Sequence, residues 1–374
     1  MFNKSLSVLL MVFAACTTVY AASSKGTDVP PPAWALYDRP AGAPLSVPAF
    51  EKIHATTQQD GSVKVIVRFV APSDLPQGFQ SEATIKDQVR VKAQQATIQN
   101  AQDKILKRLS KKHAEKSKRF KHIPFMALEV DAADLSILLS SPEIDSIEED
   151  VPVPPTLTQS VPLLGGDGSG AFSGFTGAGQ TVAILDTGVD KTHPFLAGKV
   201  IDEACFSSNY APHAATTVCP NGQISQTGSG AGVNCNSAIA GCDHGTHVAG
   251  IAAGNGAGFS GVAKDASVLA VQVFSRFDAN CGGLPTPCAL TYSSDYTSAL
   301  DWVYSKRSTY SIAAVNMSLG GGSNTTDCDA VSGSVKAAID NLRSAGIATV
   351  IATGNNGYTN AIGSPACIST AVSV

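Results

Sequence analysis

The chain has 374 residues, which is enough for two or more domains, and a formal net charge of −4. Charged residues make up 15% of the chain and glycine is abundant, with 34 residues. This balance is typical of an α/β protein with tight turns and excludes a disordered or coiled-coil chain. The weakly acidic charge gives no whole-chain argument for nucleic-acid binding, so we expect no nucleic-acid partner.

Residues 1–22 are predicted to be a secretory signal peptide. Lys4 supplies a positive charge, residues 6–15 are apolar but too short to span a membrane, and Val19-Tyr20-Ala21 fits a cleavage site. We therefore expect secretion, to the extracellular space or the periplasm, without a membrane span. Phe13-Ala14-Ala15-Cys16 is close to a bacterial lipoprotein box, so a lipid anchor at Cys16 stays open as the alternative.

Eight further cysteines lie C-terminal to residue 200. Their even number in an exported chain predicts disulfides. The sequence does not decide the pairing, and neighbours are the simplest expectation: Cys205–Cys219, Cys235–Cys242, Cys281–Cys288 and Cys328–Cys367. Zinc held by four cysteines is the alternative, although no paired C-x-x-C motif is present.

The first part of the exported chain reads as a linker followed by a small domain. Residues 23–61 contain a proline cluster and show no apolar period, which predicts a linker. Residues 62–152 predict a small α+β domain, with strands at 63–69, 125–130 and 144–150 and helices at 82–121 and 132–139. The second half of the first helix is basic, and we interpret it as a solvated face because an exported chain rarely meets nucleic acid. The proline- and glycine-rich stretch 151–180 then marks an exposed boundary.

Apolar strands alternate with helices in the rest of the chain. Strands are predicted at 181–185, 267–274, 312–317 and 348–352, and helices at 292–304 and 331–345. This pattern predicts an α/β fold with a doubly wound, mostly parallel sheet, in which ligands bind beyond the carboxyl ends of the strands. Asp186, Ser318 and Asn355 each follow a predicted strand, and His244 lies at the mouth of a helix rich in small residues. These four residues form a site hypothesis.

Three interpretations of His244 and His247 are open at this point. Both can be polar core residues, both can bind zinc, or one can be a catalytic base that an acid orients. Zinc is disfavoured, because the common zinc helix has histidines at i and i+4 with a glutamate between them. An acid, a histidine and a donor amide beyond one sheet edge suit acyl transfer: the acid holds the imidazole, the histidine accepts a proton from a hydroxyl nucleophile, and the amide donates to the oxyanion.

Four sequence blocks resemble the subtilisin-like serine proteases and occur in the family's order. They are Val182–Asp190 with His193-Pro194, Asp243–Gly250, Asn316–Gly321, and Thr353-Gly354-Asn355. The resemblance implies a subtilisin-like catalytic domain at 156–374, processed near Thr156. It also implies that residues 62–152 are an inhibitory propeptide, the chain's own intramolecular inhibitor, with Val153-Pro154-Pro155 along the substrate groove.

The resemblance also implies roles for single residues. Asp186 would be the orienting acid, His244 the base and Asn355 the side-chain oxyanion donor, and His247 would be structural, on the buried side of its helix. The substrates would be polypeptides, paired with an edge strand, and the protein a monomer. That edge strand would consist of Ser318, Leu319 and Gly320.

Two departures from the family pattern change these expectations. The nucleophile block Gly-Thr-Ser-x-Ala-x-Pro does not occur, so we expect the catalytic serine beyond residue 374 and no activity from these residues alone. The acidic calcium ligand that often follows His-Pro is Phe195 here, which puts a strong calcium site in question, although Gln159 matches one ligand. No cofactor is expected for the chemistry. The alternative function is a non-catalytic pseudo-protease or a secreted binding or inhibitor protein on the same fold.

Overall fold

A computed structural model describes residues 47–72, 75, 78–153, 174–257 and 259–374. The predicted signal peptide, the lipoprotein box, Thr156 and Gln159 lie outside these residues. Residues 43–374 form a single compact body by their internal contacts. Within the described part of the chain, none of the helices combines the length and apolar character needed to cross a membrane.

The N-terminal unit, residues 47–150, is built on an antiparallel sheet of four strands in the order β2-β3-β1-β4. Its strands are β1 (Val63–Phe69), β2 (Lys118–Arg119), β3 (Phe125–Val130) and β4 (Ile144–Glu149), and its helices are α1 (Val47–Asp60), η2 (Glu82–Thr84), α2 (Gln88–Leu106), α3 (Lys111–Ala114) and α4 (Ala132–Leu139). Alternate residues of a strand point to opposite faces. Val65 and Val67 therefore pack into one core with Leu135 of α4. Ile66 faces the other way and packs into the core of the C-terminal domain.

Two predictions for this unit were wrong. Residues 47–60, predicted as linker, form α1, because Ile53 is buried in the core of the unit. The predicted long helix 82–121 is interrupted: α2 begins after Asp87, whose side chain accepts a hydrogen bond from Val89 N, and Lys118–Arg119 pair with β3. Tertiary pairing therefore overrides helix propensity at the end of the segment.

A mostly parallel sheet of seven strands forms the C-terminal domain, in the order β17-β15-β13-β6-β10-β7-β9. The strands are β6 (Thr181–Asp186), β7 (Val200–Phe206), β9 (Ser225–Thr227), β10 (Ser267–Gln272), β13 (Ile312–Met317), β15 (Ala348–Ile351) and β17 (Val372–Ser373). β9 is antiparallel to β7, and the other pairs are parallel. The predicted α/β fold with a mostly parallel sheet is confirmed.

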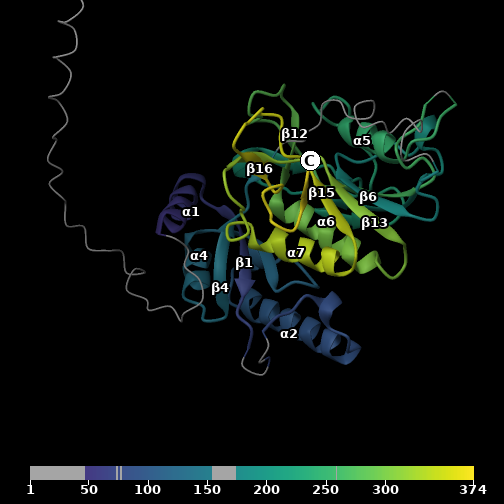
Figure 1. Cartoon of the computed structure of the whole chain (residues 1–374). Coiled ribbons are helices and arrows are strands. Elements are labelled where there is room, and N and C mark those ends of the chain that lie inside the picture. The colour runs from purple at the N-terminus through teal and green to yellow at the C-terminus, as the bar shows by residue number, and fades with distance from the viewer. Residues whose placement is uncertain (1–46, 73–74, 76–77, 154–173, 258) are drawn as a thin grey trace, which may run out of the picture. The chain divides into compact units, whose positions relative to one another are not determined.

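Helices cover both faces of this sheet (Figure 1). They are α5 (His244–Ala253), α6 (Ser293–Lys306) and α7 (Gly333–Ser344), with short 3-10 turns η4 (Pro194–Leu196) and η5 (Ala211–His213). Ile184 of β6 packs with Val248 and Ala249 of α5. Its neighbour Leu185 belongs to the cluster that contains the buried faces of α6 and α7. Each fully buried aliphatic side chain of this kind contributes roughly 1.5–3 kcal/mol.

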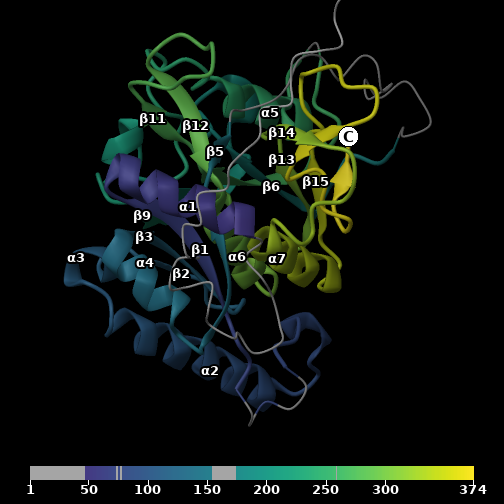
Figure 2. The same ribbon diagram turned by 90° about the vertical axis from the view of Figure 1, so that its left-hand side faces the viewer.

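The N-terminal unit lies against α6 and α7 (Figure 2). A smaller sheet in the order β5-β12-β11-β8 joins the two parts; its strands are β5 (Pro152–Val153), β8 (Ala215–Thr217), β11 (Ser275–Phe277) and β12 (Cys288–Tyr292). β14 (Gly321–Asn324) pairs with β16 (Ile362–Ser364). Four disulfides form among the residues described: Cys205–Cys219, Cys235–Cys242, Cys281–Cys288 and Cys328–Cys367. These are the neighbour pairs expected from the sequence.

Candidate active site

Asp186 and His244, 58 residues apart in the sequence, meet at the carboxyl end of β6. Asp186 Oδ1 lies 2.8 Å from His244 Nδ1. Because an ionised carboxylate only accepts hydrogen bonds, Nδ1 carries the proton and Nε2 is the free nitrogen of the ring. Among the described residues, the buried Nε2 atom has no hydrogen-bond partner. The pair therefore offers an oriented imidazole with one nitrogen available for proton transfer.

Small residues allow α5 to approach β6 closely enough for this contact. A Cβ at Gly245 would lie 2.3 Å from the Gly188 carbonyl oxygen, and a Cβ at Gly188 would lie 2.1 Å from the Val233 carbonyl oxygen. Gly188 also has a φ of +86°, which favours glycine. The hydroxyl of Thr187 accepts a hydrogen bond from Gly245 N at 2.9 Å and so satisfies one amide at the start of α5. Thr187 N in turn donates to Asp186 Oδ1 at 2.7 Å.

The environment of the pair sets the proton affinity of His244. Burial lowers the pKa of His244, but the hydrogen bond and the negative charge of Asp186 outweigh burial, so the pKa lies above its usual value. The Asp186 side chain is fully buried, and its Oδ2 has no hydrogen-bond partner among the described residues. A buried carboxylate beside an imidazole stabilises the imidazolium that forms when the histidine accepts a proton.

His247 does not lie where the family resemblance placed it. Its side chain is exposed and borders a pocket with Phe195 and Phe259, so the prediction that it lies on the buried side of the helix was wrong. Three positions along a helix turn it by about 300°, so His247 is offset from His244 by about 60° and still reaches the exposed side of α5. Among the described residues, the potential metal ligands that cluster are His113, Asp131 and Asp134 rather than the two histidines of α5.

The other predicted site residues follow strands that neighbour β6. β13 pairs with both β6 and β15, so Ser318 and Asn355 lie beyond the carboxyl ends of adjacent parallel strands. Asn355 is exposed in the loop after β15. Ser318 and Leu319 are buried, and the Ser318 hydroxyl accepts a hydrogen bond from Asn316 Nδ2 at 3.0 Å. Gly320 follows with a φ of +155°. The roles of these residues in oxyanion and substrate binding stay predictions.

Two features of the site were missed in the sequence. Gln272, at the end of β10 beside Asp186, is fully buried and donates from Nε2 to the Thr187 carbonyl at 2.6 Å. β12 pairs antiparallel with residues 152–153 and also lies beside Ala240, which leads to α5. Gln272 could have been predicted as a site residue, because it is a polar residue at the end of a buried strand. The pairing of β12 could not, because no local sequence pattern indicates it.

Phe195 occupies the position at which the family pattern often has an acidic calcium ligand. Its ring contacts Phe259, with 4.7 Å between the ring centroids. A Cβ at Gly254 would lie 2.0 Å from the Phe195 ring, so glycine there makes room for it. An aromatic ring offers no oxygen ligand, so the residues at this position do not fit calcium.

Comparison with known proteins agrees with this geometry. A family model described as the subtilase family matches residues 177–374, just over half of the chain. The chain therefore belongs to the subtilase family. The minor extracellular protease Vpr of Bacillus subtilis is 32% identical over 236 residues, which are 61% of this chain and 24% of that protein. Subtilisin E of Bacillus subtilis is 28% identical over 269 residues, 69% of this chain and 57% of that protein.

A solved structure extends the likeness in fold beyond the region of the family match. The epidermin leader peptide processing serine protease of Staphylococcus aureus has a TM-score of 0.51 at 15% identity, covering 83% of this chain and 68% of that chain. At this identity the likeness concerns the fold. The chain spans 24% and 57% of the lengths of the two curated relatives named above.

Proposed function

We propose that the chain is part of the precursor of a secreted serine endopeptidase that hydrolyses peptide bonds with an Asp–His–Ser triad. The observation that carries the proposal is the hydrogen bond of 2.8 Å between Asp186 Oδ1 and His244 Nδ1, with Nε2 left without a partner among the described residues. A serine hydroxyl placed at Nε2 would complete the triad. The sequence contains no Gly-Thr-Ser-x-Ala-x-Pro block, so we propose that the serine is supplied from outside these 374 residues.

In the proposed mechanism each of the two residues has one task. His244 Nε2 removes the proton of the serine hydroxyl as the oxygen attacks the substrate carbonyl, and later returns a proton to the leaving amine. Asp186 holds the Nδ1–H tautomer and stabilises the imidazolium between these two steps. We assign to Asn355 the side-chain hydrogen bond to the oxyanion, an interaction worth roughly 3 kcal/mol of the barrier.

We further propose that the N-terminal unit is an inhibitory propeptide. Val153 and Pro152 pair with Thr291 and Tyr292 of β12 as an added antiparallel strand, which is a common way to bind an extended peptide. This supports a model in which residues after 150 enter the cleft as a substrate would. It also makes β12 a candidate substrate-binding strand in addition to Ser318–Gly320.

Carboxylates of the N-terminal unit support the same proposal, because they complete two helices of the C-terminal domain. Neither α6 nor α7 has a side-chain N-cap of its own. Asp150 accepts hydrogen bonds from Ser294 N at 2.9 Å and from Ser293 Oγ at 2.8 Å. Glu148 accepts hydrogen bonds from Gly333 N, at 3.1 Å, and from Ser334. Each such cap is worth about 1 kcal/mol, so the unit gains affinity for the helix ends that it covers.

Secretion is part of the proposal. Four disulfides in the C-terminal domain are typical of an oxidising compartment, and one relative is by name an extracellular protease. The positively charged, apolar start of the sequence fits export as well. We propose polypeptide substrates, a monomeric protein and no cofactor for the chemistry.

The complete protein encoded by the reading frame that contains these residues tests the proposal. It is expected to hydrolyse labelled casein and to react with a fluorophosphonate probe. His244→Ala should lower the rate by about 10⁴- to 10⁶-fold and abolish labelling. His247→Ala, an exposed histidine on the same helix, is the matched control and should leave most activity. A complete protein without hydrolysis or labelling would instead indicate a non-catalytic binding protein.

A further inference from the structure

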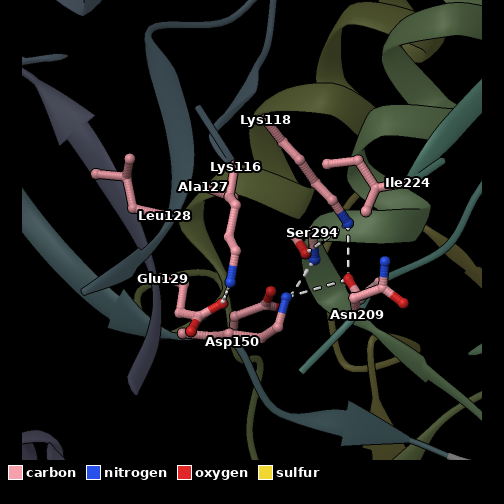
Figure 3. Close-up of a pocket in the computed structure, with 11 residues that line it drawn as sticks. Lys116, Lys118, Ala127, Leu128, Glu129, Asp150, Asn209, Ile224 and Ser294 are labelled. Carbon is pink, nitrogen blue, oxygen red and sulfur yellow. Dashed lines mark hydrogen bonds and ion pairs between the residues drawn. The ribbon is translucent and has the colours of Figure 1, made fainter. Parts of the chain in front are cut away.

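Lys64, Lys118 and Asp295 are buried together where the N-terminal unit meets α6, and neither catalysis nor helix capping uses their side chains. Figure 3 shows Lys118 and Ser294 in the adjoining pocket. Lys64 comes from β1 and Lys118 from β2, while Asp295 belongs to the first turn of α6. Asp295 is fully buried and the Lys118 side chain is 11% exposed. Burying a charge costs desolvation free energy unless an opposite charge and hydrogen bonds offset the loss, so Lys118 and Asp295 depend on each other.

The contacts of Lys118 match the donors of an ammonium group. Its Nζ donates to Asp295 Oδ1, to Ser208 Oγ at 2.8 Å and to Ser294 Oγ at 3.4 Å. An ammonium carries three N–H donors, and three oxygens of the C-terminal domain accept them. A guanidinium presents its donors in one plane and does not fit such a tripod.

The tripod of Asp295, Ser208 and Ser294 belongs entirely to the C-terminal domain and is buried. Both serines are buried, and Ser208 N donates to Ser275 Oγ at 2.7 Å. The Ser208 hydroxyl also donates to Asp295 Oδ1 at 3.3 Å. Asp295 Oδ2 has no hydrogen-bond partner among the described residues. All three tripod residues come from the C-terminal domain; the N-terminal unit contributes the two cations and Asp150, which also accepts a hydrogen bond from Ser294 N.

Lys64 places a second cation beside the tripod. Its Nζ donates to Ser208 Oγ at 3.2 Å and lies 4.7 Å from the ring centroid of Tyr292 and 5.6 Å from that of Tyr210. Aromatic faces at these distances attract a cation. Burial, together with the charge of Lys118, lowers the pKa of Lys64 to about 8. Burial raises the pKa of Asp295, and the two lysines counteract that rise.

We propose that Asp295, Ser208 and Ser294 form a lysine-selective ammonium-binding site of the C-terminal domain. In this chain Lys118 is its ligand. A second step rests on the proposed function. When the N-terminal unit leaves, the site opens. It then fits Lys118 of a detached N-terminal unit from another copy of the chain. The site thus selects for an ammonium group beside the α6 cap, with Ser294 taking part in both contacts.

The full 374-residue chain tests the site by chemical rescue. Lys118→Ala removes the ammonium and is expected to lower the melting temperature by roughly 5–10 °C, because a buried carboxylate loses its partner. n-Butylammonium chloride should raise the melting temperature of this variant in a concentration-dependent way, and n-butanol of the same size should not. Lys118→Arg should remain as unstable as Lys118→Ala. Lys116→Ala is the matched control, because Lys116 pairs with Glu129 inside the N-terminal unit at 3.2 Å.

Adding Asp295→Asn to Lys118→Ala should abolish the response to n-butylammonium. An equal response to the amine and the alcohol, or wild-type stability of Lys118→Arg, would refute the site. If Lys118→Ala does not fold unaided, the chain is refolded from denaturant with n-butylammonium or with n-butanol. A yield of folded chain with the amine alone supports the site. Equal yields with both additives, including no folded chain with either, refute it. The readout is the melting temperature and does not depend on hydrolysis. An inactive complete protein would therefore refute the proposed function without affecting this test.

Discussion

Replacing Asp186 by asparagine in the complete protein is the sharpest test of the proposed triad. The carboxylate is fully buried and accepts hydrogen bonds from His244 Nδ1 and from Thr187 N. An asparagine at this position keeps the shape of the side chain but loses the charge. It can also turn its NH₂ group toward His244, which then carries its proton on Nε2 and cannot act as the base.

The size of the effect follows from the geometry. With charge centres about 4 Å apart and an effective dielectric constant near 20, the carboxylate stabilises the imidazolium by about 4 kcal/mol. That energy corresponds to about 10³ in rate. The wrong tautomer adds to the loss, so Asp186→Asn should lower kcat by roughly 10³- to 10⁴-fold; neutralising a triad acid typically costs about 10⁴-fold. KM should change little, because no substrate contact is removed.

The assay is steady-state hydrolysis of a chromogenic peptide by the complete protein, with Thr187→Ser as the control. Serine retains the hydroxyl that accepts from Gly245 N, so this variant should keep most of kcat. Loss of kcat by less than tenfold in Asp186→Asn would refute the orienting role. So would a loss that appears entirely in KM.

Three further predictions concern pH and stability. Because Asp186 holds the pKa of His244 above 6.5, activity should be lost as the pH falls through that raised value, and the acidic limb of the kcat/KM profile should lie above 6.5; an unshifted limb would contradict the pairing. Burial raises the pKa of Glu148 from 4.5 to about 7, so the stability that Glu148 contributes is fully present below pH 4.5 and is lost as the pH rises through 7. The melting temperature should fall over this pH range, and Glu148→Gln should remove the fall. Replacing Cys328 and Cys367 by serine opens a loop with a sequence separation of 39 and should reduce the free energy of unfolding by about 4 kcal/mol, measured by denaturant titration; an unchanged midpoint would contradict it.

The sequence predicted the elements whose cause is local. Apolar runs such as 181–185 and 312–317 became β6 and β13, because strands buried on both faces are apolar throughout. The meeting of Asp186 with His244 was also predictable, since motif order and strand ends bring them to one edge. β7 was missed: its sequence includes Asp202 and Glu203, which interrupt the apolar pattern. Glu203 is buried because Lys191 Nζ pairs with it at 2.5 Å, and such a distant partner cannot be read from a local pattern.

Contacts between the N-terminal unit and the C-terminal domain could not be predicted from the sequence, because they too join residues that are distant along the chain. The basic stretch around Lys118 was interpreted as a solvated face, and several of its members are indeed exposed. Lys118 itself is nearly buried against Asp295, and a composition count cannot distinguish it from Lys116 two positions earlier, which is 46% exposed. The difference arises because Lys116 precedes β2, whereas Lys118 is in β2 and pairs with Ala127 of β3, a position that only the folded sheet defines.

The Asp186–His244 pair and the contacts with the N-terminal unit lie on opposite faces of one sheet. His244 starts α5, whose buried face packs on one side of β6, whereas the helices that meet the N-terminal unit pack on the other side. Stabilising contacts at Glu148, Asp150 and Lys118 can therefore be strengthened or weakened without rebuilding the Asp186–His244 pair. β12 lies between the two regions: it pairs with residues 152–153 on one edge and leads directly into α6. Under the proposed function, release of the N-terminal unit would uncap α6 and free the edge of β12 in the same event, so loss of inhibition and exposure of the lysine site should occur together.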